Sequence, residues 1–202
     1  METRAIFIDK DGTLVNDVPY NVDPERVELT SKAVEGLRLF TRLGFRLVVV
    51  SNQPGVALGY FDENALGKVW QRLDQLLRPE GVVIDGYYYC PHHRVGAVRK
   101  YVLACGCRKP LPGMLLRAAS ELGIDLADSW MIGDILHDVE AGRRAGCKTV
   151  LVDNGNETEW QLSPLRTPDL TVSNLYDAAL QIATLEQVTA HERRHDMRSA
   201  AL

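Results

Sequence analysis

Short apolar runs alternate along this chain with longer segments in which apolar residues recur at helical spacing. The apolar runs have the length and β-branched content of buried strands, and they predict strands at residues 5–8, 45–50, 84–89, 130–132, 149–152 and 170–172. The helical spacing predicts helices at residues 31–44, 62–77, 112–122, 137–145 and 174–188. Because helices regularly separate the strands, we expect an α/β fold in which helices sandwich one parallel sheet.

These elements account for residues 1–188 as a single domain. Polar, turn-rich segments at 16–30 and 153–168 are expected to be loops. Residues 189–202 are charged and have no apolar partners, so we expect them to form a frayed C-terminal tail.

Composition and charge narrow the class of protein. The 202 residues are 46% hydrophobic and 25% charged, which is sufficient for one well-buried core. The net charge of -4 provides no general attraction to nucleic acids or anionic membranes, so we expect neither as a partner. The protein is expected to be a monomer. No apolar segment is long enough to span a bilayer, and the first residues do not have the layout of a signal peptide, so a cytoplasmic location is expected.

Polar side chains follow several of the predicted strands at their carboxyl ends or in the loops beyond. They are Asp9 and Asp11, Ser51 and Asn52, Lys109, and Asp134 with Asp138. In an open parallel sheet these ends meet at one edge, outside which ligands bind. Asp9 and Asp11 alone would equally suit a solvated turn after an edge strand, but the complete set favours a site for chemistry.

The order of these residues resembles the four motifs of the haloacid dehalogenase (HAD) superfamily of phosphotransferases. The matching segments are Asp9-Lys10-Asp11-Gly12-Thr13, Ser51-Asn52, Lys109, and Gly133-Asp134 followed by Asp138. The resemblance extends from residue 5 to about residue 152 and implies a Rossmann-like fold. Dehalogenases of this superfamily lack the second acid, so Asp11 indicates phosphoryl transfer, with water as the acceptor.

The resemblance implies that two acids and a divalent cation carry the reaction. Asp9 is expected to be the nucleophile that becomes an aspartyl phosphate, and Asp11 to protonate the leaving alkoxide and then to deprotonate the attacking water. Mg²⁺ prefers oxygen ligands, and its expected ligands are Asp9, the main-chain carbonyl of Asp11, and Asp134.

The remaining motif residues are expected to support this chemistry. Lys109 adds a positive charge, and Ser51 and Asn52 can donate hydrogen bonds to the phosphoryl oxygens. Thr13 completes the first motif as a supporting residue. Asp138 either contacts a metal-bound water or holds Lys109, or else it only stabilises the start of its helix as an N-terminal acid.

Three of the four cysteines lie in two tight groups with a histidine. These groups are Cys90-Pro91-His92 and Cys105-Gly106-Cys107. Three thiols and an imidazole suit a closed tetrahedral zinc site, whereas reduced core cysteines are the alternative. His93 is a competing imidazole, but His92 has the same one-residue gap as the second cysteine pair. A closed site leaves no position for water, so we expect a structural zinc that orders the loop 90–107.

The sequence around this loop resembles the zinc-loop branch of the superfamily, which contains heptose-bisphosphate phosphatases and, with a shorter loop, histidinol-phosphate phosphatases. The loop length favours the former. The resemblance implies that there is no large cap domain and that a small phosphorylated sugar is the substrate, most directly the 7-phosphate of D-glycero-D-manno-heptose 1,7-bisphosphate. The alternatives are histidinol phosphate or another small sugar phosphate, a polynucleotide 3′-phosphate, and, from a different class, a zinc-stabilised binding module without activity.

A bisphosphate substrate requires a second anion site. Arg108 follows the last zinc ligand directly, and its guanidinium could hold a phosphate with two hydrogen bonds, although a surface ion pair is the alternative. Gln53 is a candidate for binding a sugar hydroxyl. Leu58 stands where this branch usually has an arginine. Arg94, Arg99 and Lys100 in the zinc loop could compensate for the lost charge, or they could simply be solvated.

Overall fold

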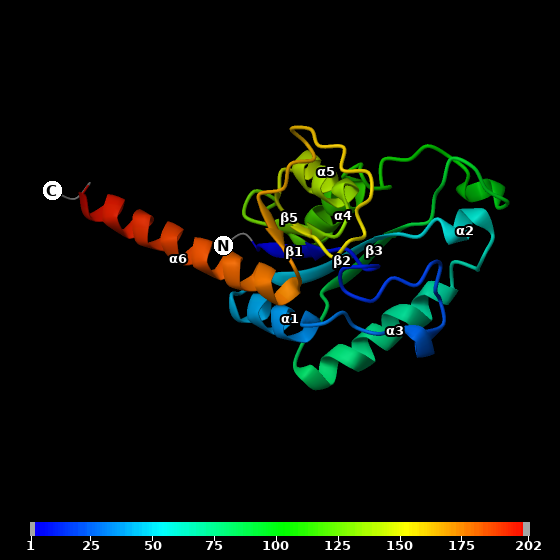
Figure 1. Cartoon of the computed structure of the whole chain (residues 1–202), viewed down its shortest axis with the longest axis horizontal. Coiled ribbons are helices and arrows are strands. Elements are labelled where there is room, and N and C mark those ends of the chain that lie inside the picture. The colour runs from blue at the N-terminus through cyan, green and yellow to red at the C-terminus, as the bar shows by residue number, and fades with distance from the viewer. Residues whose placement is uncertain (1–2, 200–202) are drawn as a thin grey trace.

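The computed structural model describes residues 3–199, with side chains to residue 188, and contains one parallel six-stranded sheet (Figure 1). The strand order is β3-β2-β1-β4-β5-β6. The strands are β1 (Ala5–Ile8), β2 (Arg46–Asn52), β3 (Gly86–Cys90), β4 (Trp130–Gly133), β5 (Lys148–Val152) and β6 (Leu170–Val172). The predicted parallel α/β class is confirmed.

Helices connect the strands and cover the sheet. The α-helices are α1 (Ala33–Arg42), α2 (Gly55–Leu58), α3 (Ala65–Leu77), α4 (Gly113–Leu122), α5 (Leu136–Ala145) and α6 (Leu175–Ser199). Short 3-10 helices lie at η1 (Pro24–Arg26), η2 (Arg78–Glu80) and η3 (Arg99–Tyr101). From β2 to β4 the described chain contains no second sheet, so it forms no separate cap domain. Within residues 3–199 no helix is long and apolar enough to cross a membrane.

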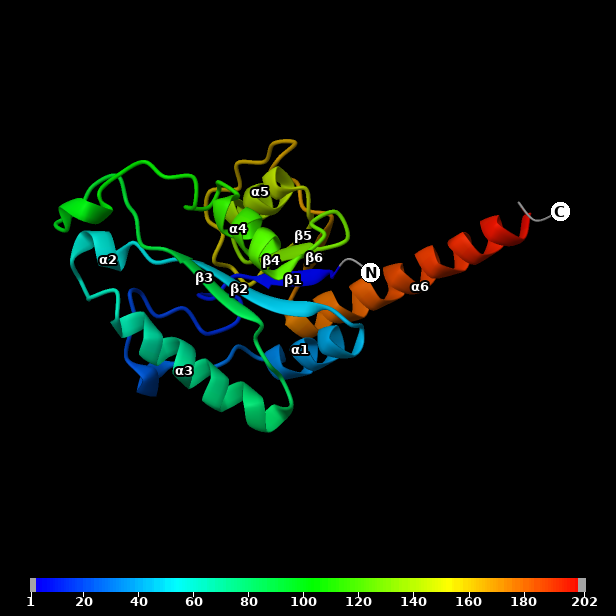
Figure 2. The same ribbon diagram turned by 180° about the vertical axis from the view of Figure 1, so that it is seen from behind.

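The two faces of the sheet bury alternate side chains of each strand. Ile6 and Ile8 of β1 belong to a core cluster with residues of α1, α3 and α6. Ala5 and Phe7 belong to a second cluster with residues of α4 and α5 on the opposite face. Figure 2 shows the helices on the two faces of the sheet from behind. Burial on both faces explains why the strands are nearly continuous apolar runs.

The direction in which strands are added reverses at β1. β2 and β3 follow on one side of it, whereas β4, β5 and β6 follow on the other. Such a reversal leaves a crevice outside the carboxyl ends of the two strands where the order changes. Residues that follow β1 and β4 therefore meet in that crevice.

The C-terminal segment differs from the prediction. Helix α6 continues to Ser199, whereas a frayed tail was predicted from residue 189, and residues 200–202 lie outside the described residues. The second half of α6 extends away from the body of the molecule (Figures 1 and 2). The prediction required apolar partners for any helix. An existing helix can instead lengthen through one backbone hydrogen bond per added residue, and residues 189–199 contain no glycine or proline to stop it.

Candidate active site

Three carboxylates lie together where β1 and β4 end. One oxygen each of Asp9, Asp134 and Asp138 lies within 4.8 Å of the others. The two strands are paired, and the main-chain N–H of Asp9 donates to the carbonyl of Ile132 at 2.9 Å, which brings the residues after both strands side by side. The three acids are only 7%, 4% and 0% exposed. Their mutual repulsion in such a buried site requires positive charge nearby.

Lys109 supplies one such charge inside the cluster. Its ammonium contacts the carboxylate of Asp9, lies 2.6 Å from Oδ1 of Asp138 and donates to the carbonyl of Val50 at 3.1 Å. Burial alone would lower the pKa of Lys109, but Asp138 and Asp9 raise it above its ordinary value, so the lysine stays charged.

Asp138 contacts both Lys109 and the start of its own helix. It forms the ion pair with Lys109. Its Oδ2 also accepts the main-chain N–H of Ile135 at 3.4 Å, at the start of α5. The two oxygens of this carboxylate thus make one contact each, so the two contacts do not exclude each other.

Lys109 does not neutralise the whole cluster. Burial and the carboxylates of Asp138, Asp134 and Asp11 raise the pKa of Asp9 well above its ordinary value, in spite of the lowering effect of Lys109. Burial, followed by the charge of Asp138, raises the pKa of Asp134 to about 6. Three buried carboxylates against one ammonium leave an excess of negative charge. A hard divalent cation with oxygen ligands, such as Mg²⁺, fits that excess.

Asp134 is held at both of its oxygens. The hydroxyl of Thr13 donates to Oδ1 at 3.1 Å, and the amide Nδ2 of Asn156 donates to Oδ2 at 2.7 Å. Gly12 has a φ of +84°, and a Cβ there would lie 2.1 Å from Oδ2 of Asp134. Only glycine therefore allows this close approach. Asn156 was missed from the sequence. The available signal was its position in the loop after β5, the strand next to β4.

Asp11 lies at the entrance to the cluster. Lys10 Nζ is 2.6 Å from Oδ1 of Asp11, whose side chain is 30% exposed. Oδ2 accepts a hydrogen bond from the amide of Gln53 at 3.0 Å, and the hydroxyl of Ser51 lies 3.5 Å from the same oxygen. The amide of Gln53 thus orients Asp11, and binding of a sugar hydroxyl by Gln53 stays a prediction. The contact of Lys10 was not anticipated.

Asn52 connects β2 to the segment that carries Lys109. Its Nδ2 donates to the carbonyl of Lys109 at 3.1 Å, and its Oδ1 accepts the N–H of Lys109 at 3.0 Å. Both polar atoms of the side chain thus bind the main chain of one residue. This pairing fixes the position from which the lysine side chain enters the cluster.

A cavity of about 210 Å³ opens over these groups. The residues predicted to handle the phosphoryl group all line it, namely Asp9, Asp11, Ser51, Asn52, Lys109 and Asp134. Asn156 lines it as well. The topology therefore unites these predicted residues, which come from four separate segments, in one space.

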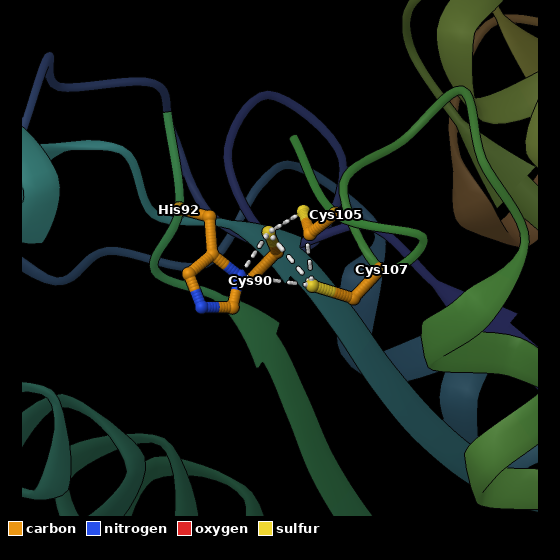
Figure 3. Close-up of side chains that lie close together, drawn as sticks. All are labelled: Cys90, His92, Cys105 and Cys107. Atoms are coloured by element: carbon orange, nitrogen blue, oxygen red, sulfur yellow. Dashed lines mark hydrogen bonds between the residues drawn. The ribbon is translucent and has the colours of Figure 1, made fainter. Parts of the chain in front are cut away.

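The second group of predicted ligands also converges (Figure 3). The Sγ atom of Cys107 lies 3.1 Å from that of Cys90 and 3.3 Å from that of Cys105, and 3.2 Å from Nδ1 of His92. Four donor atoms within 4.8 Å of one another, three thiols and an imidazole with no carboxylate, form a donor set that suits a closed tetrahedral zinc site. His93 is turned away, with its Nδ1 2.8 Å from the carbonyl of Val95, which agrees with the preference for His92.

Arg108 lies in a second cavity next to the first. This cavity has a volume of about 350 Å³, and its lining includes Arg94, Arg108, His137 and Arg144. Lys109 lines both cavities. Nη1 of Arg108 lies 3.5 Å from the carbonyl of His92, which relates the guanidinium to the cysteine loop. The space beside the carboxylates is therefore rich in cationic side chains.

Known proteins resemble this chain over most of its length. The HAD-hydrolase-like family model matches residues 106–178. The chain is 44% identical over 153 residues to the D-glycero-beta-D-manno-heptose-1,7-bisphosphate 7-phosphatase of Pasteurella multocida (strain Pm70), covering 75% of this chain and 83% of the relative. The enzyme of the same name from Escherichia coli (strain K12) is 41% identical over 170 residues, or 80% of this chain and 89% of the relative.

A solved structure has the same fold. It is the D,D-heptose 1,7-bisphosphate phosphatase from B. bronchiseptica, complexed with magnesium and phosphate. The alignment has a TM-score of 0.74 and 28% identity, and it covers 90% of this chain and 99% of that chain.

Proposed function

Because this chain belongs to the heptose-bisphosphate phosphatase family of the HAD-like hydrolases, we propose that it removes the 7-phosphate from D-glycero-D-manno-heptose 1,7-bisphosphate. The chain is a phosphatase that hydrolyses phosphomonoesters. The observation that carries the proposal is the cavity of about 210 Å³ that Asp9, Asp11, Lys109 and Asp134 line together.

Asp9 is the nucleophile in this proposal. Its carboxylate oxygen forms a bond to phosphorus while the bond from phosphorus to the sugar oxygen breaks, which leaves an aspartyl phosphate. The contact with Lys109 supports the ionised form that attack requires. The hydrogen bonds of Asn52 support the role of Lys109, because they hold its main chain in place.

Asp11 moves the protons. In the first step it donates a proton to the departing sugar oxygen. In the second step it accepts a proton from the water that attacks the aspartyl phosphate, and this step restores Asp9 and releases inorganic phosphate. Its partial exposure and its hydrogen bond from Gln53 support this role, since the acid is oriented and still reachable from solvent.

Asp9, the main-chain carbonyl of Asp11, and Asp134 would hold Mg²⁺. When bound, this cation would offset the repulsion between the phosphate and the attacking carboxylate, which is about 4 kcal/mol for each unit-charge pair at 4 Å and an effective dielectric of 20. The excess of buried negative charge supports this assignment. Ser51 and Asn52 line the same cavity and can donate to the phosphoryl oxygens.

Arg108 holds the phosphate that is not cleaved. The cavity that it shares with Arg94 and His137 adjoins the reaction cavity through Lys109, and it offers cationic groups to a second anion. The only acid of its lining, Glu140, is paired with Arg144 and Arg166 at 2.7 Å each. Arg94 thus supplies positive charge where Leu58 does not.

Cys90, His92, Cys105 and Cys107 hold a structural zinc that orders the loop between β3 and α4. Their four-fold donor set supports this role because it leaves no position for a water ligand. A monomer in the cytoplasm completes the proposal. Analytical ultracentrifugation and cell fractionation test those two points.

Phosphate release from a panel of substrates tests the proposal. The panel contains the heptose bisphosphate, a heptose monophosphate, histidinol phosphate and a 3′-phosphorylated oligonucleotide. We expect the bisphosphate to give the highest kcat/KM. Asp9→Asn should lower kcat by roughly 10³-fold or more, because the nucleophile is removed while the shape is kept.

Arg108→Ala gives a sharper test of the second anion site. Losing a charged pair of hydrogen bonds should lower kcat/KM for the bisphosphate by roughly 10- to 100-fold. The monophosphate serves as the matched control and should be hydrolysed as before. Equal losses of kcat/KM on both substrates would contradict the proposed role of Arg108. In the substrate panel, a higher kcat/KM for another member would contradict the proposed substrate.

A further inference from the structure

The loop after β5 contacts the acid cluster, although no motif assigns it a part in the reaction. Asn156 lies in this loop, 22 residues from Asp134 in sequence, and donates its amide to Oδ2 of that carboxylate at 2.7 Å. The side chain also lines the reaction cavity. Among the described residues, this hydrogen bond is the one contact between the loop and a carboxylate that is expected to bind the metal.

Two neighbours of Asn156 connect the same loop to the rest of the site. Nδ2 of Asn154 donates to the carbonyl of Gly12 at 2.7 Å, in the turn that follows β1. The carboxylate of Glu157 accepts the main-chain N–H of Leu136 at 2.7 Å, at the first residue of α5. The loop thus joins the segment that carries Asp9 to the segment that carries Asp134.

The loop is also organised internally. Oδ1 of Asn154 accepts the main-chain N–H of Asn156 at 3.2 Å, and the second oxygen of Glu157 accepts the main-chain N–H of Glu159 at 2.8 Å. Such turns fix the direction in which the Asn156 side chain leaves the backbone. The amide therefore approaches Asp134 from a supported position and not from a free loop.

We propose that Asn156 is a positioning residue that sets the orientation of the Asp134 carboxylate for a divalent cation. Together with Thr13 on Oδ1, it restrains rotation of the carboxylate. Mg²⁺ requires nearly ideal octahedral geometry, so a ligand whose direction is restrained binds it with less reorganisation. A neutral amide does this without adding a further negative charge to the cluster. The inference rests on the proposed function, since it assumes that Asp134 is a ligand.

A purely structural role for Asn156 is poorly supported. The residue is exposed, and the hydrogen bond that its side chain donates goes to Asp134. Removing it should therefore leave the folding of the metal-free protein nearly unchanged. A positioning role predicts instead a change in cation affinity.

Titration calorimetry of the full-length protein with Mg²⁺, in the absence of substrate, separates these roles. Asn156→Ala should raise the Kd for Mg²⁺ by roughly 10- to 100-fold, the range for losing a residue that orients a metal ligand. Thr158→Ala is the matched control, because Thr158 is exposed in the same loop and its side chain makes no hydrogen bond to the described residues. Its Kd should stay within about twofold of the parent value.

Two further measurements complete the test. The unfolding midpoint of Asn156→Ala in magnesium-free buffer should match that of the parent. At saturating Mg²⁺ its kcat should return to near the parent value. A Kd equal to that of the parent would overturn the inference. If the parent protein itself binds no Mg²⁺, the proposed metal site fails, and the inference fails with it.

Discussion

Replacing Lys109 by methionine removes a buried positive charge and keeps a side chain of similar length. In the parent protein Nζ lies 2.6 Å from Asp138 and contacts Asp9, and the lysine is only 3% exposed. The variant leaves two buried carboxylates without their common partner. We expect it to be strongly destabilised, because these charges cannot reach solvent.

The size of the effect follows from this burial. Removing one partner of a buried ion pair typically destabilises a protein by about 3–5 kcal/mol. The loss should depend on pH. Lys109 lowers the pKa of Asp9, so this pKa rises further in the variant. An acid whose pKa is higher in the folded than in the unfolded protein makes folding less favourable as pH rises. The loss of stability in the variant should therefore be largest near pH 8 and smaller near pH 5.

Urea unfolding measures this loss of stability. The buffer omits only magnesium, so that a bound zinc stays in the folded protein. Lys32→Met is the control, because Lys32 is exposed and, among the described side chains, pairs only with Glu35 at the surface. The control should change the free energy of unfolding by less than about 0.5 kcal/mol. Adding Asp138→Asn to Lys109→Met should recover part of the loss, since one of the two uncompensated charges is then absent.

Two results would refute the reasoning. The first is a loss below about 1 kcal/mol for Lys109→Met at pH 8, which would mean that the acids are not effectively buried. The second is a loss that does not shrink between pH 8 and pH 5. Protonation of Asp9 would then not relieve the missing charge.

Three further predictions concern the two proposed metal sites. Cys105→Ser should reduce the zinc content, measured by atomic emission, from about one per chain to near zero. Cys147→Ser should retain the zinc, because that thiol lies outside the cysteine and histidine cluster. A full zinc content in Cys105→Ser would contradict the proposed zinc site. Gly12→Ala should abolish Mg²⁺ binding and activity, because its Cβ would lie 2.1 Å from Oδ2 of Asp134. Gly44→Ala is the control and should keep both, because Gly44 has a similar positive φ but no atom lies within 4 Å of the position of its Cβ. Equal losses in the two variants would point to backbone strain alone. Burial and a neighbouring carboxylate raise the pKa of Asp134 to about 6, so in calorimetry the Kd for Mg²⁺ should rise about tenfold or more per pH unit below 6. A constant Kd from pH 5 to 8 would exclude competition with protons.

Local patterns in the sequence predicted the strands, and the family resemblance added the motif residues around the reaction cavity, but not Asn156. Buried parallel strands are apolar throughout, so their ends are marked by the first polar residues, as at Asp9, Ser51 and Asp134. Once the strands are known to be parallel, these ends must share an edge. The candidate zinc ligands in the cysteine loop were equally predictable, because metal ligands in such loops lie in closely spaced pairs along the chain.

Other features depend on contacts that spacing does not encode. The side chain of Lys10 bends to its neighbour Asp11, and the amide of Gln53 orients that acid, although neither contact has a periodic signature. The hydrophobic pattern predicts the end of α6 too early, because its last residues lie beyond the segment that has apolar periodicity.

The sequence by itself determined the parallel α/β class and which residues meet at the sheet edge, because hydrophobic periodicity and chain order are local properties. The tertiary structure alone decided which side chain orients which. Asn156 lies in an irregular loop, and its amide meets Asp134 only because β5 lies next to β4 in the sheet. The contacts of Lys109 with Asp9 and Asp138 likewise join three distant segments. Hydrogen bonds and buried ion pairs depend on distances of a few tenths of an ångström, which only the packed fold sets.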